Sequence, residues 1–437
     1  MLKRIKIQGY KSLVDLEVNF EHLVVLVGPN ASGKSNFLDA LHLLSRVATS
    51  RTLKEAFDPP YRGHALESFT FGEEGIKSLL EQETVSFSIE VDVQLSPKIV
   101  ENVNRQILKM RRVPLDEDES VSRRSPPTVR SRNLRYRIEI EMLPKLGTLR
   151  VANEYLAALN TTGEMNQKRK PFLEQIDNQL HLRMEGQARP THYERGLNYS
   201  ILSMAHYPPH HPHLVAMRQE LASWFTFYFE PRERMRLPNP VKEVHHIGLM
   251  GEDLAAFLNT LQARSPRQFE SIEKSLHAMI PSITGIEIDV NALGEVELNL
   301  REGEKRISAR GVSDGTLRIL GLLTLVGAEE PPALIGFEEP ENGVHPRRIR
   351  RIARFLEARM LLEDIQFIVT THSSLLPDLI PPESVYVCRK VDGNTEIEPL
   401  TMMYLGPLWK RVNIEDVLAD ESALSPSERI LRGDFDA

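Results

Sequence analysis

Gly28-Pro29-Asn30-Ala31-Ser32-Gly33-Lys34-Ser35 is the stretch that decides the fold of this 437-residue chain. A buried-type run, residues 23–27, precedes it, and residues 35–44 carry apolar side chains at helical spacing. The glycines let successive backbone N–H groups turn inward, and the helix start adds its positive end, so the loop suits phosphate groups. We expect Lys34 to reach the β- and γ-phosphates of ATP and the Ser35 hydroxyl to ligate Mg²⁺. The predicted ATP-binding residues are Gly28, Asn30, Ala31, Ser32, Gly33, Lys34, Ser35 and Asn36.

A loop of this kind needs an acidic partner at the end of a neighbouring strand. Residues 333–340, Ala-Leu-Ile-Gly-Phe-Glu-Glu-Pro, form an apolar run that ends in two carboxylates. We assign the contact with Mg²⁺ to Glu338 and the general-base role to Glu339. The alternative is an exposed acidic turn, which paired carboxylates at the end of a buried strand do not favour.

A second buried run, residues 366–371, is followed directly by His372. One predicted helix, residues 347–362, separates it from the acidic strand, so His372 should lie at the same edge of the sheet. We predict that it senses the γ-phosphate or stabilises developing charge.

Residues 311–316, Gly-Val-Ser-Asp-Gly-Thr, precede a helical run over residues 317–326. A Ser-x-Gly turn at the start of a helix is a second anion-binding feature. The turn contains no lysine and no metal ligand, so we expect it to act on a phosphate that is bound elsewhere.

The remaining elements are predicted from periodicity. Alternating apolar residues indicate antiparallel strands at residues 5–7, 16–20, 86–93 and 134–142. Residues 253–261 and 269–279 have the pattern of amphipathic helices, and residues 286–290 and 296–300 that of a strand pair. The aromatic run at residues 224–229 fits a buried strand or a buried helix.

Two polar segments leave alternatives open. Residues 109–132 contain Arg111, Arg112, Arg123, Arg124 and Arg130 among Pro, Ser and acidic residues, which indicates a solvated loop or a nucleic-acid contact. Residues 206–213 contain four histidines, which suggests a metal site. No cysteine or carboxylate lies at ligand spacing there, so a polar loop is favoured.

Composition restricts the class of protein. The formal net charge is −7, so any contact with nucleic acid must be local. The one cysteine, Cys388, excludes an internal disulfide framework. The first residues lack the apolar core of a signal peptide, and no segment has the roughly 20 apolar residues needed to span a bilayer. We expect a cytoplasmic protein without a membrane contact.

The segments GPNASGKS, GVSDGT, LIGFEEPENGVHP and IVTTHSS, in this order, resemble the ABC-type ATPase heads of the RecF/SMC/OLD branch. Within it, the chain looks most like the stand-alone AAA-type ATPases of bacterial anti-phage systems. The resemblance implies an α/β fold in which a P-loop mixed sheet with helices is joined by an antiparallel β subdomain. The halves of the head would be residues 1–155 and 246–437, with a compact α-helical or mixed insert at residues 156–245.

In this branch two heads enclose ATP, which implies a homodimer or a higher even-numbered homo-oligomer. By resemblance, Ser313 and Gly315 would touch the γ-phosphate bound by the partner copy, while Glu339 and His372 would act in their own copy. Lys11 and Ser12 would lie near the nucleotide. The sequence departs from the pattern at Glu338, where Asp is usual. It also departs at Asp314, where the signature turn of these heads, here residues 311–316, has glycine. Gln82 is a candidate for the glutamine that completes the Mg²⁺ shell.

The resemblance also implies what the head does. About 65 residues follow His372, too few for the TOPRIM nuclease of OLD proteins, and no heptad pattern predicts SMC-like coiled-coil arms. We expect an ATPase that controls a separate effector, a nuclease or a toxin, with DNA as a further partner. The alternative is a nucleotide-sensing scaffold in which hydrolysis is incidental. A nuclease within this chain and a transporter subunit are disfavoured.

Overall fold

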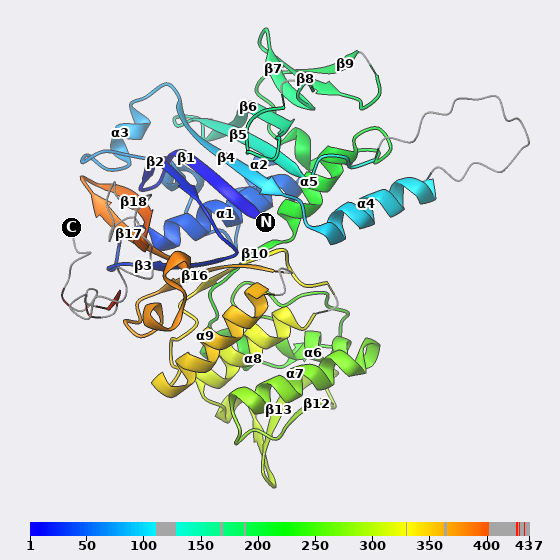
Figure 1. Cartoon of the computed structure of the whole chain (residues 1–437), viewed down its shortest axis with the longest axis vertical. Coiled ribbons are helices and arrows are strands. Elements are labelled where there is room, and N and C mark those ends of the chain that lie inside the picture. Colours follow the sequence, from blue (N-terminus) through cyan, green and yellow to red (C-terminus); the bar gives the residue numbers. More distant parts are fainter. Residues whose placement is uncertain are drawn as a thin grey trace, which may run out of the picture. The chain divides into compact units, whose positions relative to one another are not determined.

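The computed structural model describes residues 1–110, 128–166, 169–187, 189–328, 330–361 and 365–401, and also residues 425, 426, 428 and 432. Contacts divide the chain into two units (Figure 1). The first comprises Met1–Phe20, Asn36–Trp224 and Val391–Glu396, and the second comprises Glu21–Ser35, Phe225–Lys390 and Ile397–Ala437. The division at residues 155 and 245 stays a prediction, and the two units separate at other points.

The first unit is built on an eight-stranded sheet whose pairings are antiparallel. Apolar side chains alternate along its central strands, so one face is buried: Ile5 lies opposite Val91 and Ile7 opposite Ile89. The four antiparallel strands predicted from the sequence are confirmed. In spatial order the strands are β2 (Leu13–Asn19), β1 (Leu2–Tyr10), β4 (Val85–Gln94), β5 (Asn133–Leu143), β6 (Thr148–Ala158), β7 (Leu173–Ile176), β8 (Gln179–Arg183) and β9 (Pro190–Glu194).

The helices of this unit differ in how they are buried: α5 is buried on most sides, whereas α4 buries one apolar stripe. In α4, Ile99, Val103 and Ile107 are buried at a spacing of four residues. The longer helices are α1 (Lys34–Thr49), α4 (Pro97–Met110) and α5 (Pro212–Ala222), and the short ones are α2 (Leu53–Phe57), η1 (Ala65–Ser68), α3 (Lys77–Leu80) and η2 (Ile201–Ser203).

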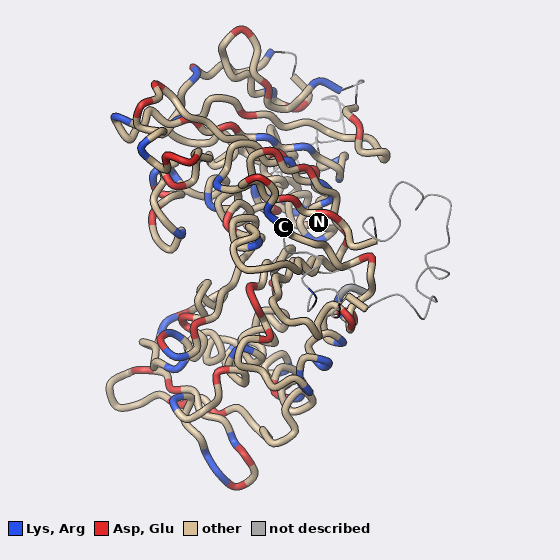
Figure 2. Tube along the Cα trace, turned by 90° about the vertical axis from the view of Figure 1, so that its left-hand side faces the viewer, with Lys and Arg blue, Asp and Glu red and all other residues tan. Residues whose placement is uncertain are grey.

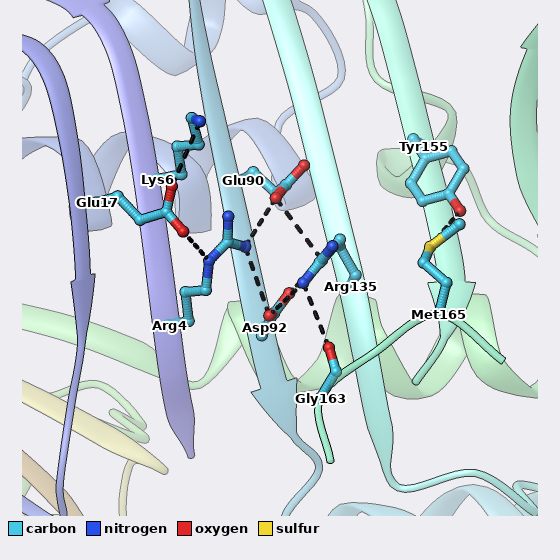
Figure 3. A network of polar contacts seen from close by, with 9 residues as sticks. All are labelled: Arg4, Lys6, Glu17, Glu90, Asp92, Arg135, Tyr155, Gly163 and Met165. Atoms are coloured by element: carbon cyan, nitrogen blue, oxygen red, sulfur yellow. Dashed lines mark hydrogen bonds and ion pairs between the residues drawn. The ribbon is translucent and has the colours of Figure 1, made fainter. Parts of the chain in front are cut away.

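A charged network crosses four strands of the eight-stranded sheet (Figure 3). Arg4 on β1 pairs with Glu17 on β2 and with Glu90 on β4, and Arg135 on β5 holds both oxygens of Asp92 at 2.6 and 2.7 Å. The charges are balanced by one another, so this network stabilises neighbouring strands and offers no unpaired group to a ligand.

A second, six-stranded sheet has the order β10 (Trp224–Phe227), β15 (Leu334–Glu338), β16 (Gln366–Thr371), β3 (Leu23–Val27), β17 (Val385–Val391) and β18 (Asn394–Pro399). β15, β16, β3 and β17 run parallel to their neighbours within this group. Every residue of β3 and β16 is buried, as their continuous apolar runs predict. The aromatic run forms β10, so of the two alternatives the strand is correct.

The rest of the second unit consists of helices and a smaller antiparallel sheet. Its helices are α6 (Leu254–Arg264), α7 (Pro266–Met279), α8 (Asp314–Val326) and α9 (Pro346–Leu361), with short turns η3 (Pro231–Met235), η4 (Ala309–Gly311), η5 (Pro377–Leu379) and η6 (Pro382–Ser384). The sheet contains β11 (Asn239–Pro240), β12 (Gly285–Val290), β13 (Glu295–Glu302) and β14 (Lys305–Ser308). The predicted helices and the predicted strand pair are confirmed. Within the described residues, none of the helices combines the length and the apolar character that a bilayer crossing needs.

Candidate nucleotide site

The ends of three parallel strands define the site. In the register of the sheet Glu338 lies opposite Thr370, and Thr371 lies opposite Val27. The loops that follow β3, β15 and β16 therefore leave the sheet at the same edge, where ligands bind in open parallel sheets. The phosphate loop, the paired carboxylates and His372 are brought together as predicted, although their chemical roles remain predictions.

The phosphate loop depends on close backbone packing. A side chain at Gly28 is impossible because its Cβ would lie 2.0 Å from the carbonyl oxygen of Cys388 on β17. Ala31 and Gly33 have positive φ values of 62° and 106°, which turn the chain sharply. The Cys388 thiol also donates to the Ser32 carbonyl at 3.4 Å, so β17 packs directly against the phosphate loop.

Lys34 lies inside the phosphate loop and is only 5% exposed. Its Nζ donates to the carbonyls of Gly28 and Pro29, both at 2.8 Å. Burial lowers the pKa of Lys34, an effect that Cys388 and the carboxylates of Glu339 and Glu338 oppose. The ammonium is thus held where a phosphate can replace the two carbonyls as its partner.

The predicted metal ligands touch each other. The Ser35 hydroxyl donates to Oε1 of Glu338 at the end of β15. A hydroxyl and a carboxylate are oxygen ligands of the kind that Mg²⁺ takes, and Mg²⁺ is usually held by one or two carboxylates plus substrate phosphates. The donor set, next to a loop that only glycine can form, therefore fits Mg²⁺ and ATP.

Glu339 and His372 form a pair across the loops. Nε2 of His372 lies 3.1 Å from Oε1 of Glu339, and the Glu339 amide donates to the Thr370 carbonyl at 3.0 Å. Glu339 has a φ of 48°, a left-handed conformation that is uncommon outside glycine and is found at functional sites. Burial, together with the charge of Lys34, lowers the pKa of His372, which favours a neutral ring that donates a hydrogen bond.

Glu341 is a residue of this site that sequence reasoning missed. Its Oε1 accepts from the Thr371 hydroxyl at 2.5 Å and from the amides of His372 and Ser373, both at 3.2 Å. Burial raises the pKa of Glu341. The only local signal was a third acidic residue after the acidic strand, and its partners lie 30 or more residues away.

The signature turn caps α8. The Ser313 hydroxyl accepts from the Thr316 amide at 3.3 Å, while the residue itself is exposed. Gly315 is buried, and a Cβ there would lie 2.4 Å from the carbonyl oxygen of Gly343, in the loop after β15. Both predicted residues thus have structural reasons in their own copy, and their contact with a second copy stays a prediction.

Asp314 is held by two arginines from η3 and the residue after it. Arg232 pairs with one carboxylate oxygen at 3.0 Å, and Arg236 pairs with the other at 2.6 Å and donates to the Val312 carbonyl at 2.6 Å. A carboxylate that faces an anion would be unfavourable, but two guanidinium groups offset its charge. This ion-pair cluster explains how the turn accommodates Asp at a glycine position.

The other predicted nucleotide residues lie in the first unit. The side-chain amide of Asn36 donates to the Ser12 hydroxyl at 2.8 Å, and Lys11 forms an ion pair with Asp39 at 2.8 Å. These two contacts fasten the Lys11-Ser12 segment to α1. The exposed Gln82 donates to the Ser78 carbonyl at 3.3 Å. The roles of these residues at a nucleotide stay predictions.

Within residues 206–213, the side chains of two histidines have hydrogen-bond partners inside the protein. His213 is not in a loop but in α5, fully buried, where Nδ1 lies 2.6 Å from Glu185 and Nε2 accepts from the amides of Arg130 and Ser131. His206 contacts the Ile201 carbonyl at 2.7 Å. The described residues contain no group of three or more metal-ligating side chains. Most of the basic segment, residues 111–127, lies outside the described residues.

Comparisons with known proteins point to ATPase domains in both halves of the chain. A family model described as "AAA ATPase domain" matches residues 1–192, and one described as "AAA domain, putative AbiEii toxin, Type IV TA system" matches residues 187–378. The DNA replication and repair protein RecF of Lactococcus lactis subsp. lactis is 29% identical over 98 residues, 22% of this chain and 25% of that protein. RecF of Synechocystis sp. is 31% identical over 96 residues, 22% of this chain and 23% of that protein. The matched part thus spans about a quarter of the length of these relatives.

Among solved structures, an SMC head bound to the C-winged helix domain of ScpA covers 91% of this chain and 96% of its own chain. The TM-score is 0.50 at 13% identity, a likeness of fold. Both halves of the chain thus resemble ATPase domains, and its fold is that of an SMC head. The predicted fold of this head, a mixed α/β P-loop sheet with an antiparallel β part, is confirmed.

Proposed function

We propose that this ABC-type head binds and hydrolyses Mg²⁺-ATP between two copies of the chain and that the cycle controls a separate effector. The observation that carries the proposal is the single sheet edge where Lys34, the Ser35–Glu338 pair and the Glu339–His372 pair converge. These are the groups needed to hold a triphosphate, to hold its metal and to activate water.

Bound Mg²⁺-ATP supplies the transferable phosphoryl group. In the chain, Lys34 exchanges the carbonyls of Gly28 and Pro29 for phosphate oxygens, and Ser35 and Glu338 hold the metal. Glu339 orients a water molecule and accepts its proton. The single N–H of the neutral His372 ring, 3.1 Å from Glu339, keeps that carboxylate in place until a γ-phosphate takes over the hydrogen bond.

The proposed assembly is a homodimer or a higher even-numbered homo-oligomer in the cytoplasm. Ser313 supports this assembly because it is exposed at the start of α8, where its hydroxyl caps the helix and does not contact the phosphate loop of its own copy. In this arrangement Ser313 and Gly315 of one copy contact the γ-phosphate bound by the other. Partner binding by a similar head is known from the SMC head that is bound to ScpA.

The proposed effector is a nuclease or a toxin in anti-phage defence or in DNA metabolism. The matched relatives are named for DNA replication and repair, and one family description names a toxin system. DNA is therefore a second proposed partner.

The test uses Lys34→Ala and Glu339→Gln in the full chain, with ATP turnover and oligomeric state as readouts. Lys34→Ala should lose nucleotide binding because the buried ammonium is gone. Glu339→Gln should bind ATP, lose turnover by about 100-fold or more, as removal of a general base does, and accumulate as a dimer with ATP. Chelation of Mg²⁺ should abolish wild-type turnover, and addition of Mg²⁺ should restore it. Normal turnover by Glu339→Gln would refute the assignment of the general base.

A second candidate is a nucleotide-sensing scaffold, favoured by Glu338 and by the Asp314 cluster, which depart from the usual pattern. Here nucleotide binding alone would switch the effector. Effector release by a non-hydrolysable ATP analogue would support the scaffold, whereas a strict need for turnover would support the ATPase cycle.

A further inference from the structure

One face of α9 carries a row of four exposed arginines. Arg347, Arg350, Arg351 and Arg354 follow the i, i+3, i+4, i+7 spacing that places side chains on one side of a helix, and all four are exposed. The opposite side, with Ile349, Ile352 and Leu356, is buried in the core of the second unit.

The helix is basic as a whole. It contains six arginines and one acidic residue, Glu357, in a chain whose formal net charge is −7. Elsewhere acidic and basic residues are mixed along the trace (Figure 2). A concentrated positive face is therefore a local feature of α9, of the kind that an acidic protein needs in order to bind a polyanion.

Among the described residues, three arginines of this row have no carboxylate partner. Several other exposed arginines do, such as Arg105 with Glu101, Arg301 with Glu287 and Arg306 with Asp289. Within the part of the chain that the structure describes, the side chains of Arg347, Arg350 and Arg354 have no ion pair or hydrogen bond.

The fourth arginine has a structural task. Arg351 donates to the carbonyls of Ala278 at 3.1 Å and Met279 at 2.6 Å, which fastens α9 to the end of α7. Arg351 is therefore left unchanged in the test below.

We propose that this arginine row binds the phosphate backbone of duplex DNA without reading its sequence. Arg347 and Arg354 are about 10 Å apart along the helix axis, the length of about three base pairs of duplex. Guanidinium groups contact phosphates through paired hydrogen bonds. The core of a protein–protein interface is depleted of charged residues, whereas four exposed positions on this face of α9 carry a positive charge. The inference rests on the DNA-related part of the proposed function.

The test measures binding of a fluorescent duplex oligonucleotide to the full chain by anisotropy, over a series of salt concentrations. The variant is Arg347→Ala/Arg350→Ala/Arg354→Ala, and the control is Arg105→Ala/Arg301→Ala/Arg306→Ala, which removes the same charge from paired sites. We expect the α9 variant to bind at least about tenfold more weakly, with a slope of log K against log salt about two to three units shallower. The control should stay within about threefold of wild type, since it removes no proposed phosphate contact.

Equal DNA binding by the α9 variant and the control would overturn the proposal. So would wild-type protein that binds single-stranded RNA or an acidic peptide but not duplex DNA. ATP turnover, measured in parallel, separates the two hypotheses: a wild type that hydrolyses ATP without binding duplex DNA refutes this inference and leaves the proposed function standing. If the triple variant does not fold, Arg350→Glu gives the same comparison with one substitution.

Discussion

At the scale of single residues, the loops after β15 and β16 are joined by two side chains with different tasks. Glu339 contacts the ring of His372, whereas Glu341 contacts the backbone that carries this ring. Three donors on one oxygen of Glu341 fix the turn Thr371–Ser373. Glu341 is thus expected to act through His372 as a positioning residue.

This expectation leads to a prediction for Glu341→Ala. Amide hydrogen exchange at His372 and Ser373 should become at least about tenfold faster because these amides lose their acceptor. ATP turnover should fall by about tenfold, with little change in ATP affinity, since the P-loop is untouched. Glu341→Gln keeps an acceptor oxygen and should restore most of both properties.

A double-mutant cycle with His372→Ala distinguishes positioning from a general structural role. If Glu341 acts through His372, then Glu341→Ala should cost no further turnover in the His372→Ala protein. Losses that multiply in the double variant, or unchanged exchange at His372 in Glu341→Ala, would contradict the assignment.

At the scale of elements, the signature turn and the loop after β15 are in close contact through two glycines. A Cβ at Gly315 would lie 2.4 Å from the Gly343 carbonyl oxygen, so the first turn of α8 fits only without a side chain. The same loop carries Glu339 and Glu341. A shift of the turn should therefore affect both the copy that contains it and the copy whose phosphate it is proposed to contact.

Gly315→Ala tests this contact. Helix propensity alone would predict a stabilisation of about 1 kcal/mol. We expect instead that the free energy of unfolding falls by about 1–3 kcal/mol because the added methyl group forces the backbone apart. Dimer formation with ATP in the Glu339→Gln background should also be lost.

The control is Gly72→Ala, where no atom lies within 4 Å of the added Cβ. Chemical denaturation measures stability, and size-exclusion chromatography with light scattering measures dimer formation. A stability gain in Gly315→Ala equal to the helix-propensity value would show that the turn has room for a side chain.

The elements that sequence patterns predicted are those with strong local signals. The run at residues 23–27 and the run before His372 are continuous and apolar, and they form β3 and β16 at the expected positions. The phosphate loop after β3 and the loop after β16 could be assigned to the nucleotide site, because phosphate chemistry demands particular residue types in a particular order. The ion pair of Asp314 with Arg232 could not be predicted, because the partners are 82 positions apart and no local pattern links them.

The same reason explains the histidine segment. His213 is buried by contacts with Glu185 and with the backbone of Arg130 and Ser131, all distant in sequence. The predicted loop is correct for residues 206–211, but satisfied hydrogen bonds let His213 enter a helix in the interior.

At the scale of the whole molecule, the proposed cycle needs two copies, because each would supply a P-loop to one site and a signature turn to the other. Such a composite site can be tested by mixing two inactive variants. Lys34→Ala removes the P-loop function. Ser313→Asp keeps an oxygen that caps α8 but places a negative charge towards the γ-phosphate.

Each variant alone should be inactive, because every site in its homodimer has one defect. A mixed dimer has one site with both defects and one site with none. An equal mixture, if subunits exchange at random in a two-fold symmetric dimer, should therefore recover about one quarter of wild-type turnover. Recovery should depend on protein concentration and should be absent when Lys34→Ala is mixed with Glu339→Gln, since both defects lie in the same half of the site. Full turnover by Ser313→Asp alone, or no recovery in the mixture, would mean that each copy completes its own site.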